Sequence, residues 1–214
     1  METSTIRSKL YIFIVVYLGV QAALIAPQAF AASVSSREYQ VKAAFLYNFI
    51  QFTEWPAAKT ADNNNTISIG VIGDDPFGAA FDPVKEKTVK NKKMVIKRFG
   101  RFTELIKGAN EDKSKPAENT EALRKCHVLF VCDSEKENLS KIIEIVKDSG
   151  VLTVGQSENF LDAGGIIRFI KEAEKVAFEV NLIAAKEAGV QVSSQVLRLA
   201  KRVITDETAD DKNK

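Results

Sequence analysis

Chemically reactive side chains are few in this sequence, and they gather in one short apolar run. His127 is the only histidine, and the two cysteines, Cys126 and Cys132, belong to the same segment, CHVLFVC. Neighbouring side chains of a strand point to opposite faces, so Cys126 and His127 do not form a catalytic dyad. A metal site needs three or four converging ligands, and the sequence shows no such cluster. We therefore predict a protein that is not an enzyme and that uses no metal or cofactor.

The two cysteines stand at the ends of one predicted strand, Cys126–Cys132. Six residues of extended chain span about 20 Å, whereas the Cα atoms of a disulfide lie within about 7 Å of each other. We therefore expect two buried thiols and no disulfide between these cysteines within one chain. A bridge between two chains, or one formed after a bend in this segment, is the alternative for an exported protein.

A glycine-rich stretch, Gly70–Gly78 (GVIGDDPFG), has some features of a nucleotide-binding loop. It is not G-x-G-x-x-G, and it lacks the Gly-Lys-Ser/Thr of a P-loop. Pro76 also interrupts the expected entry into a helix, so we interpret the stretch as a turn. The alternative is a small-ligand pocket near Gly73–Phe77, because open α/β sheets bind ligands at the C-terminal ends of parallel strands.

The N-terminal segment has the pattern of an export signal. Arg7 and Lys9 precede the apolar run Leu10–Ala26, and Ala29-Phe30-Ala31 has the small-x-small pattern of a cleavage site. We expect a signal peptide at residues 1–31 that is cleaved after Ala31, which makes the mature protein periplasmic. An uncleaved membrane anchor is the alternative reading of the apolar run.

The rest of the chain is long enough for one domain with a sizeable core. We place that domain at residues 32–204 and a disordered charged tail at residues 205–214. The formal net charge of the chain is +2, which argues against a nucleic-acid partner.

A long apolar helix is predicted in Arg37–Pro56, with Ser35 and Glu38 as a capping box. Its polar residues fall on one narrow stripe, so the helix is either a plain core element or half core and half subunit interface. The side chains assigned to this dimer or core face are Phe45, Leu46, Phe49 and Phe52.

A strand–helix–strand unit follows later in the chain. Cys126–Cys132 and Val151–Gly155 are continuous apolar strands, typical of a parallel sheet that is buried on both faces. Glu135–Ser149 between them is an amphipathic helix, for which Ser134 and Glu137 form a predicted capping box. Its inward stripe repeats at helical spacing and consists of Leu139, Ile142, Ile143 and Val146.

The remaining elements complete an α/β fold. Ile166–Ile170 and Val176–Val180 predict an antiparallel hairpin, and Asn181 caps a short helix, Leu182–Ala188. Gly108–Thr120 is a predicted surface loop, and Ser193 or Ser194 caps a last helix that reaches about Ile204. We predict a single three-layer domain with a mixed sheet, in which a parallel βαβ core is joined by the hairpin and helices cover both faces. The other expected elements are strands at Thr66–Ile72 and Lys93–Phe99, a short helix at Phe77–Lys87 and a weak helix or turn at Arg101–Lys107.

A partner-binding surface is predicted along the C-terminal half of the Glu135–Ser149 helix and the loop Gly155–Gly165. The loop carries apolar residues among glycines and polar residues, and exposed apolar side chains favour contact with a partner. The alternative is a loop that is tucked onto its own domain. The residues assigned to this surface are Lys141, Glu144, Lys147, Glu158, Asn159, Phe160 and Leu161.

Several of these segments together carry a family resemblance. EYQVKAAFLYNFIQFTEWP, CHVLFV, VLTVGQSENFLDAGGIIRFI, VAFEVNLIAAKEAG and SSQVLRLA are similar to the YfiR/HmsC-like family of periplasmic proteins. The resemblance implies a non-enzymatic repressor that binds the periplasmic domain of an inner-membrane diguanylate cyclase, or of another sensor protein. An outer-membrane-associated protein can sequester such a regulator, which raises cyclic di-GMP and favours biofilm.

The resemblance also implies a homodimer, and it implies disulfides in some members. This chain departs from that pattern, because its two cysteines are six residues apart. The rival functions are a periplasmic small-ligand-binding protein that uses the pocket near Gly73–Phe77 and, third, a secreted enzyme.

Overall fold

The structure, a computed structural model, describes residues 36–60, 65–107, 116–173 and 175–206. The chain divides into two compact units, Met1–Glu38 and Tyr39–Lys214, and the folded domain lies in the second. The predicted signal peptide, Ser35 of the first capping box and most of the C-terminal tail lie outside the described residues.

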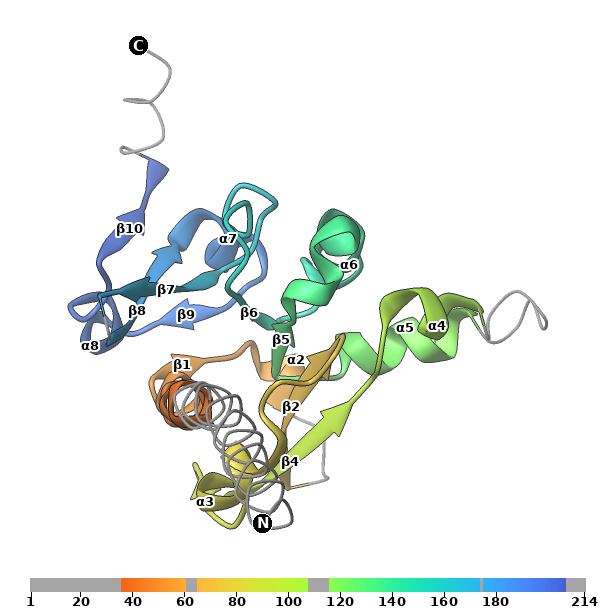
Figure 1. Cartoon of the computed structure of the whole chain (residues 1–214), viewed down its shortest axis with the longest axis horizontal. Helices are drawn as coiled ribbons and strands as arrows, with labels where there is room; N and C mark the ends of the chain where they lie inside the picture. The colour runs from red at the N-terminus through yellow and green to blue at the C-terminus, as the bar shows by residue number, and fades with distance from the viewer. Residues whose placement is uncertain (1–35, 61–64, 108–115, 174, 207–214) are drawn as a thin grey trace, which may run out of the picture. The chain divides into compact units, whose positions relative to one another are not determined.

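One large mixed sheet organises the domain (Figure 1). Among the described residues it has eight strands in the order β10-β8-β7-β6-β5-β2-β4-β3. The five strands from β7 to β4 run parallel, whereas β8 is antiparallel to β7 and β3 is antiparallel to β4. The predicted α/β fold with a parallel core is therefore confirmed. The strands are β2 (Thr66–Ile72), β3 (Thr88–Val89), β4 (Lys92–Arg98), β5 (Val128–Val131), β6 (Leu152–Gly155), β7 (Ile167–Glu172), β8 (Lys175–Asn181) and β10 (Arg202–Ile204).

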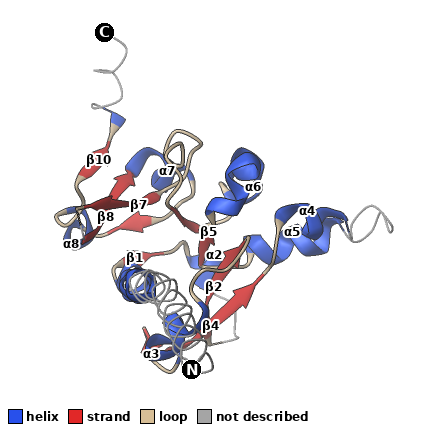
Figure 2. Ribbon diagram, viewed as in Figure 1, coloured by secondary structure: helices blue, strands red, loops and turns tan. Residues whose placement is uncertain are grey.

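Helices cover both faces of this sheet (Figure 2). One face packs on the helix at residues 39–51, shown orange in Figure 1, and the other face packs on α6. Strands β5 and β6 are buried at every residue, which explains their continuous apolar sequences. The helices are α2 (Ala57–Thr60), α3 (Asp82–Lys85), α4 (Phe102–Lys107), α5 (Pro116–Arg124), α6 (Leu139–Val146), α7 (Leu182–Glu187) and α8 (Ser194–Leu197).

A small second sheet joins the end of the first helix to the C-terminal part of the domain. Strand β1 (Thr53–Glu54) pairs antiparallel with β9 (Gln191–Val192). The amide of Ser193 also donates to the carbonyl of Phe52 at 3.0 Å. These hydrogen bonds fix the position of the short segment between the end of the helix and Trp55.

The predicted hairpin and the cap that follows it are confirmed. β7 and β8 pair in antiparallel register, with Ile167 opposite Val180. The side-chain oxygen of Asn181 accepts a hydrogen bond from the amide of Ala184 at 3.1 Å, which satisfies a donor at the start of α7. Gly189 follows α7 with φ +70°, a conformation that glycine adopts without strain.

The start of the predicted Glu135–Ser149 helix is different from the prediction. Asp133–Asn138 is a 3₁₀ helix, and only Leu139–Val146 is α-helical. The predicted capping box does not form, because the hydroxyl of Ser134 accepts from the amide of Asp74 at 2.9 Å. The inward stripe is correct, since all four of its side chains are buried.

Two predictions near the ends of elements are wrong. The last helix stops at Leu197, and the segment predicted to continue it to Ile204 instead forms β10 beside β8. Sheet pairing outweighs helix propensity there, and the amide of Lys201 already donates to the carbonyl of Phe178 at 2.8 Å. The predicted loop Gly108–Thr120 also gives way to α5 at Pro116, a residue that suits a first helical turn.

Candidate functional site

The C-terminal ends of β2 and β5 form the point where the strand order changes direction, which is the usual ligand crevice of such sheets. The predicted pocket near Gly73–Phe77 belongs here, but its polar groups bond to one another. The carboxylate of Asp74 accepts from Nε of Arg101 at 2.9 Å, and this hydrogen bond lowers the pKa of Asp74. Gly73 has φ +102°, and a Cβ there would lie 2.5 Å from Oγ of Ser134. The turn interpretation therefore fits better than an open pocket.

Beside this turn, a buried lysine ties the first helix to the strand ends. Lys42 is 4% exposed, and its Nζ donates to Oε1 of Gln156 at 2.6 Å. The amide nitrogen of Gln156 donates to Asp133 at 2.6 Å, and Ser157 donates to the other oxygen of Asp133 at 2.8 Å. The ammonium also lies 4.5 Å from the ring centroid of Tyr39. This network compensates the buried charge and holds the helix at residues 39–51 against the sheet.

The reactive residues of the sequence do not assemble a catalytic set. Cys126 and Cys132 are buried free thiols on either side of β5. Burial raises the pKa of Cys126 to about 11 and that of Cys132 to about 12, which disfavours the nucleophilic thiolate. Nδ1 of His127 lies 3.3 Å from the amide of Ser68, from which it accepts. Within the described ranges, no group of three or more His, Cys, Asp or Glu side chains could hold a metal ion.

The predicted partner surface on α6 and the loop after β6 is only partly as expected. Its charged and polar members are exposed: Lys141, Glu144, Lys147, Glu158 and Asn159. The premise that Phe160 and Leu161 form an exposed apolar centre is wrong, because they are 0% and 4% exposed and pack under α6. The surface that remains on α6 and this loop is polar and charged.

The apolar helix at residues 39–51 combines a core face with an exposed edge. Leu46 and Phe49 are 0% and 1% exposed, whereas Phe45 is half-buried and Phe52 is 37% exposed. A groove of about 240 Å³ runs from this edge to Leu199, which is 69% exposed. None of the side chains that line the groove is charged: Phe45, Asn48, Phe49, Phe52, Phe178, Gln195, Val196 and Leu199.

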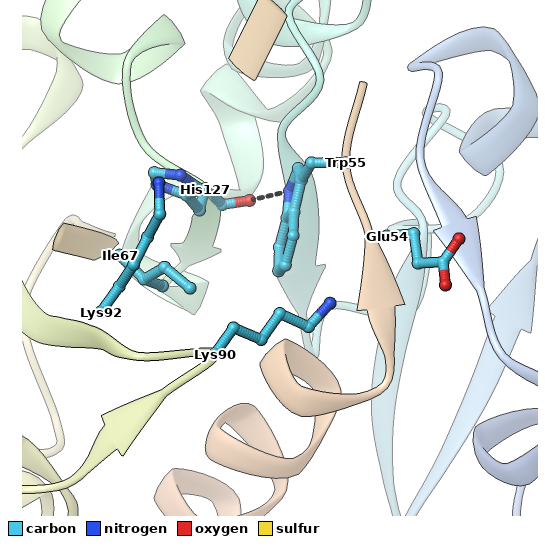
Figure 3. A pocket seen from close by; sticks show the side chains of 6 residues that line it. All are labelled: Glu54, Trp55, Ile67, Lys90, Lys92 and His127. Atoms are coloured by element: carbon cyan, nitrogen blue, oxygen red, sulfur yellow. Dashed lines mark hydrogen bonds between the residues drawn. The ribbon is translucent and has the colours of Figure 1, made fainter. Parts of the chain in front are cut away.

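A separate cavity lies at the N-terminal edge of the parallel strands (Figure 3). Its volume is about 330 Å³. Trp55, which follows β1, forms one wall, and its indole nitrogen donates to the carbonyl of His127 at 3.2 Å. The two rings meet edge-to-face, with centroids 5.5 Å apart. The residues that line this cavity are Glu54, Trp55, Ile67, Lys90, Lys92 and His127.

A tight turn places a lysine at the mouth of this cavity. Val89 pairs with Lys92, so Lys90 and Asn91 form a two-residue hairpin loop. Both loop residues have positive φ, 52° and 61°, as a type I′ turn requires. The ammonium of Lys90 lies 5.5 Å from the Trp55 ring centroid and donates to the carbonyl of Thr53 at 2.5 Å.

A further lysine stands at the same edge of the sheet. Nζ of Lys59 donates to the backbone carbonyls of Arg124 and, at 2.9 Å, Ser149. Burial lowers the pKa of Lys59 to about 8. Its hydrogen bonds to two loop carbonyls indicate a structural role, in which Lys59 holds α2 against the loops that lead into β5 and β6.

Two solved structures resemble parts of this chain. One is the ABC domain in complex with L-Trp from Streptococcus pneumonia, with a TM-score of 0.44 and 14% identity over 66% of this chain and 56% of that one. The other is a conserved domain protein from Vibrio cholerae O1 biovar El Tor, with a TM-score of 0.42 and 15% identity over 70% and 60% of the two chains. This chain thus spans less than two thirds of either structure. Comparison with curated proteins finds no match.

The sequence profile of the YfiR/HmsC-like family matches residues 39–201. The chain belongs to the YfiR/HmsC-like family. The matched range begins in the first helix and ends just before β10, so it contains the buried Lys42 network, the groove and the Trp55 cavity. YfiR-like proteins are periplasmic regulators rather than enzymes. No helix in the described part of this family member is long and apolar enough to cross a membrane.

Sequence reasoning missed the Trp55 cavity of this YfiR-like domain. Its walls come from segments that are far apart in the chain, and only the paired sheet brings them together. One local signal was available, since the polar dipeptide Lys90-Asn91 before a β-branched run is compatible with a tight hairpin. That signal could have located the lysine but not the indole that it covers.

Proposed function

We propose that this protein is a periplasmic regulator that holds an inner-membrane diguanylate cyclase inactive by binding its periplasmic domain. The observation that carries the proposal is the family match over residues 39–201, which covers nearly the whole described domain. An outer-membrane-associated protein that sequesters the regulator would release the cyclase. The buried thiols of Cys126 and Cys132 fit a contact-based role, because their raised pKa values disfavour the nucleophilic thiolate.

The cyclase-binding surface in this proposal is the outer face of α6 together with Glu158 and Asn159. Lys141 and Glu144 are exposed on this helix, and Lys147 forms an ion pair with Glu144 at 2.8 Å. Because Phe160 and Leu161 are buried, recognition on this face depends on charge and hydrogen bonds. Charged contacts at an exposed rim mainly set the association rate, so binding should weaken as salt concentration rises.

The regulator acts as a homodimer in this proposal, and the groove between the first helix and α8 is the dimer face. A twofold interface brings the same surface patch of two copies together, so a lining with charges of a single sign would repel its copy. The groove has no charged lining residue, although charged residues make up 27% of the sequence. It also offers a projecting Leu199 beside an apolar hollow, which lets each copy insert a side chain into the other.

A charge-reversal experiment tests the cyclase contact. In cells that otherwise lack the regulator, the natural protein should lower cyclic di-GMP and biofilm, whereas Lys141→Glu combined with Lys147→Glu should leave both high. The same variant should bind the purified periplasmic domain of the neighbouring cyclase at least tenfold more weakly. The control is Lys93→Glu, a charge reversal at another exposed lysine, on β4, which should repress normally. If the double variant is folded, exported at the normal level and fully repressive, α6 is not the contact surface.

A further inference from the structure

The cavity beside Trp55 combines an aromatic wall with two ammonium groups. Trp55 is half-buried, Ile67 is 2% exposed, and both present apolar surface to the cavity. Lys90 and Lys92 contribute the positive charge, one from the hairpin loop and one from the first residue of β4. Figure 3 shows the carboxylate of Glu54 directed away from the other five side chains.

The position of Glu54 follows from the strand geometry. Successive side chains along β1 and into Trp55 alternate between the two sides of the chain, so the indole and the carboxylate face opposite ways. Although Glu54 borders the cavity, its carboxylate points away from the lysines. Two ammonium groups and an indole therefore line the cavity together.

The size of the cavity limits what could bind there. Its volume of about 330 Å³ is at the lower end of the range of about 300–1,000 Å³ found for small-molecule sites. Such a volume suits one or two aromatic rings with a single anionic substituent. A flat ring would lie against the indole of Trp55, and its anionic group would reach the lysine ammoniums.

The site is held in shape before any ligand arrives. Lys90 has φ +52°, a left-handed conformation that is costly for a residue other than glycine or asparagine. The two-residue turn enforces this conformation, and the bond from Lys90 to the Thr53 carbonyl fixes the side chain over Trp55. The hydrogen bond from the indole nitrogen to the carbonyl of His127 fixes the orientation of Trp55 itself. Local strain that directs a cation over an aromatic ring is a reason to look for a binding function.

We propose that this cavity binds a small flat aromatic anion, with the ring against Trp55 and the carboxylate or phosphate between Lys90 and Lys92. This inference goes beyond the proposed regulatory function and does not depend on it. The site is also distinct from the pocket predicted at the other ends of the strands, near Gly73–Phe77.

The chain contains a single tryptophan, so selectively excited tryptophan emission reports on the surroundings of Trp55. Full-length mature protein would be titrated with 4-nitrobenzoate, 4-nitrophenyl phosphate and the uncharged 4-nitrobenzyl alcohol, all of which quench indole emission. We expect saturable quenching by at least one anion, with an affinity at least tenfold higher than that of the alcohol. Isothermal titration calorimetry would verify the same ratio without relying on quenching. The preferred anionic group then separates a carboxylate ligand from a phosphate ligand.

Three lysine variants connect the affinity to the cavity. Lys92→Met and Lys90→Met keep an apolar stem but remove the charge, and each should weaken anion binding about fivefold or more while leaving the alcohol unchanged. The matched control is Lys93→Met, because Lys93 neighbours Lys92 on β4 but points to the other face of the sheet. Equal affinities for anion and alcohol, equal losses in Lys93→Met and Lys92→Met, or no saturation up to about 10 mM would overturn the proposal.

Discussion

Phe160 explains why the loop after β6 is rich in glycine. Its ring is fully buried and lies directly on the backbone of Gly155 and Gly165, where any Cβ would collide with it. The glycines therefore make room for a core aromatic, and they do not expose backbone for a partner. At the scale of single residues, this contact turns a predicted binding anchor into a structural one.

Phe160→Ala should lower the free energy of unfolding by about 3–5 kcal/mol, because it leaves a large cavity under α6. Chemical denaturation of the purified domain would measure the loss. Asn159→Ala, at the exposed neighbouring position, should change stability by less than about 0.5 kcal/mol. A Phe160→Ala protein that has normal stability but fails to bind a partner would show that Phe160 belongs to the partner-binding surface.

The two thiols should be unreactive in the folded protein. Burial raises the pKa of Cys126 to about 11 and that of Cys132 to about 12, so almost no thiolate forms at pH 8. We expect neither cysteine to be labelled by a disulfide reagent until denaturant is added, after which both react. Non-reducing peptide mapping should show no bridge between them. Rapid labelling of the native protein would mean that β5 opens easily.

At the scale of elements, one carboxylate fastens the C-terminal strand. Glu179 on β8 is 8% exposed and accepts from Nε of Arg168 and Nε of Arg202, both at 2.9 Å. Arg202 is the first residue of β10, a strand of three residues at the edge of the sheet. So short a strand makes few backbone hydrogen bonds to β8. The charged hydrogen bonds between Arg202 and Glu179 therefore contribute much of what holds β10 to the sheet.

Glu179 should make the folding stability of the domain depend on pH. Burial raises its pKa, but the hydrogen bonds from Arg202 and Arg168 outweigh burial and hold the pKa below the ordinary 4.5. A depressed folded-state pKa gives stabilisation that is present above the unfolded pKa and is lost as pH falls through the folded value. Glu179→Gln should therefore cost about 1.5–3 kcal/mol at pH 7, and the difference from the natural chain should shrink below about pH 4.5.

Thermal or denaturant unfolding across this pH range would test that expectation. The control is Glu172→Gln, whose partner Lys201 lies at 2.7 Å in an exposed pair. Exposed pairs contribute about 0–1 kcal/mol, so this variant should stay close to the natural chain. A constant difference between Glu179→Gln and the natural protein from pH 7 to pH 3 would contradict the assignment.

At the scale of the whole molecule, the described domain has an apolar surface that its own core does not use. The sheet places Phe178 against the first helix, and α8 then brings Leu199 beside Phe52 at the open end. Rings of Phe45, Phe49 and Phe178 pack beneath, with the Phe49 and Phe178 centroids 4.9 Å apart. Exposed apolar surface of this kind is typical of a protein interface.

Leu199→Asp and Phe52→Asp should convert a dimer to a folded monomer, because each puts a charge into the proposed interface without entering the core. Light scattering after size exclusion would measure the oligomeric state, and circular dichroism would show whether each variant is folded. Phe49→Asp, at a position that is 1% exposed, should instead unfold the protein. A Leu199→Asp protein that remains dimeric would place the dimer face elsewhere.

Periodicity and turn chemistry determined much of this fold from the sequence alone. The alternation of continuous apolar runs with the stripe Leu139–Val146 predicted β5, α6 and β6, since only an element covered on both sides stays apolar throughout. Asn181 marked the start of α7 because capping is a local interaction. The polar stripe of the first helix likewise separated its exposed face from its core face.

Tertiary structure decided the features that depend on contacts between distant segments. Residues 202–204 follow a helical sequence yet form β10, because pairing with β8 and two bonds to Glu179 outweigh local propensity. Phe160 could equally have been an exposed anchor or a core residue, and only the packing of α6 over Gly155 and Gly165 placed it inside. The Trp55 cavity has the same origin, since a hairpin loop, β1 with the residue after it, and the starts of β2, β4 and β5 meet there only after the sheet has formed.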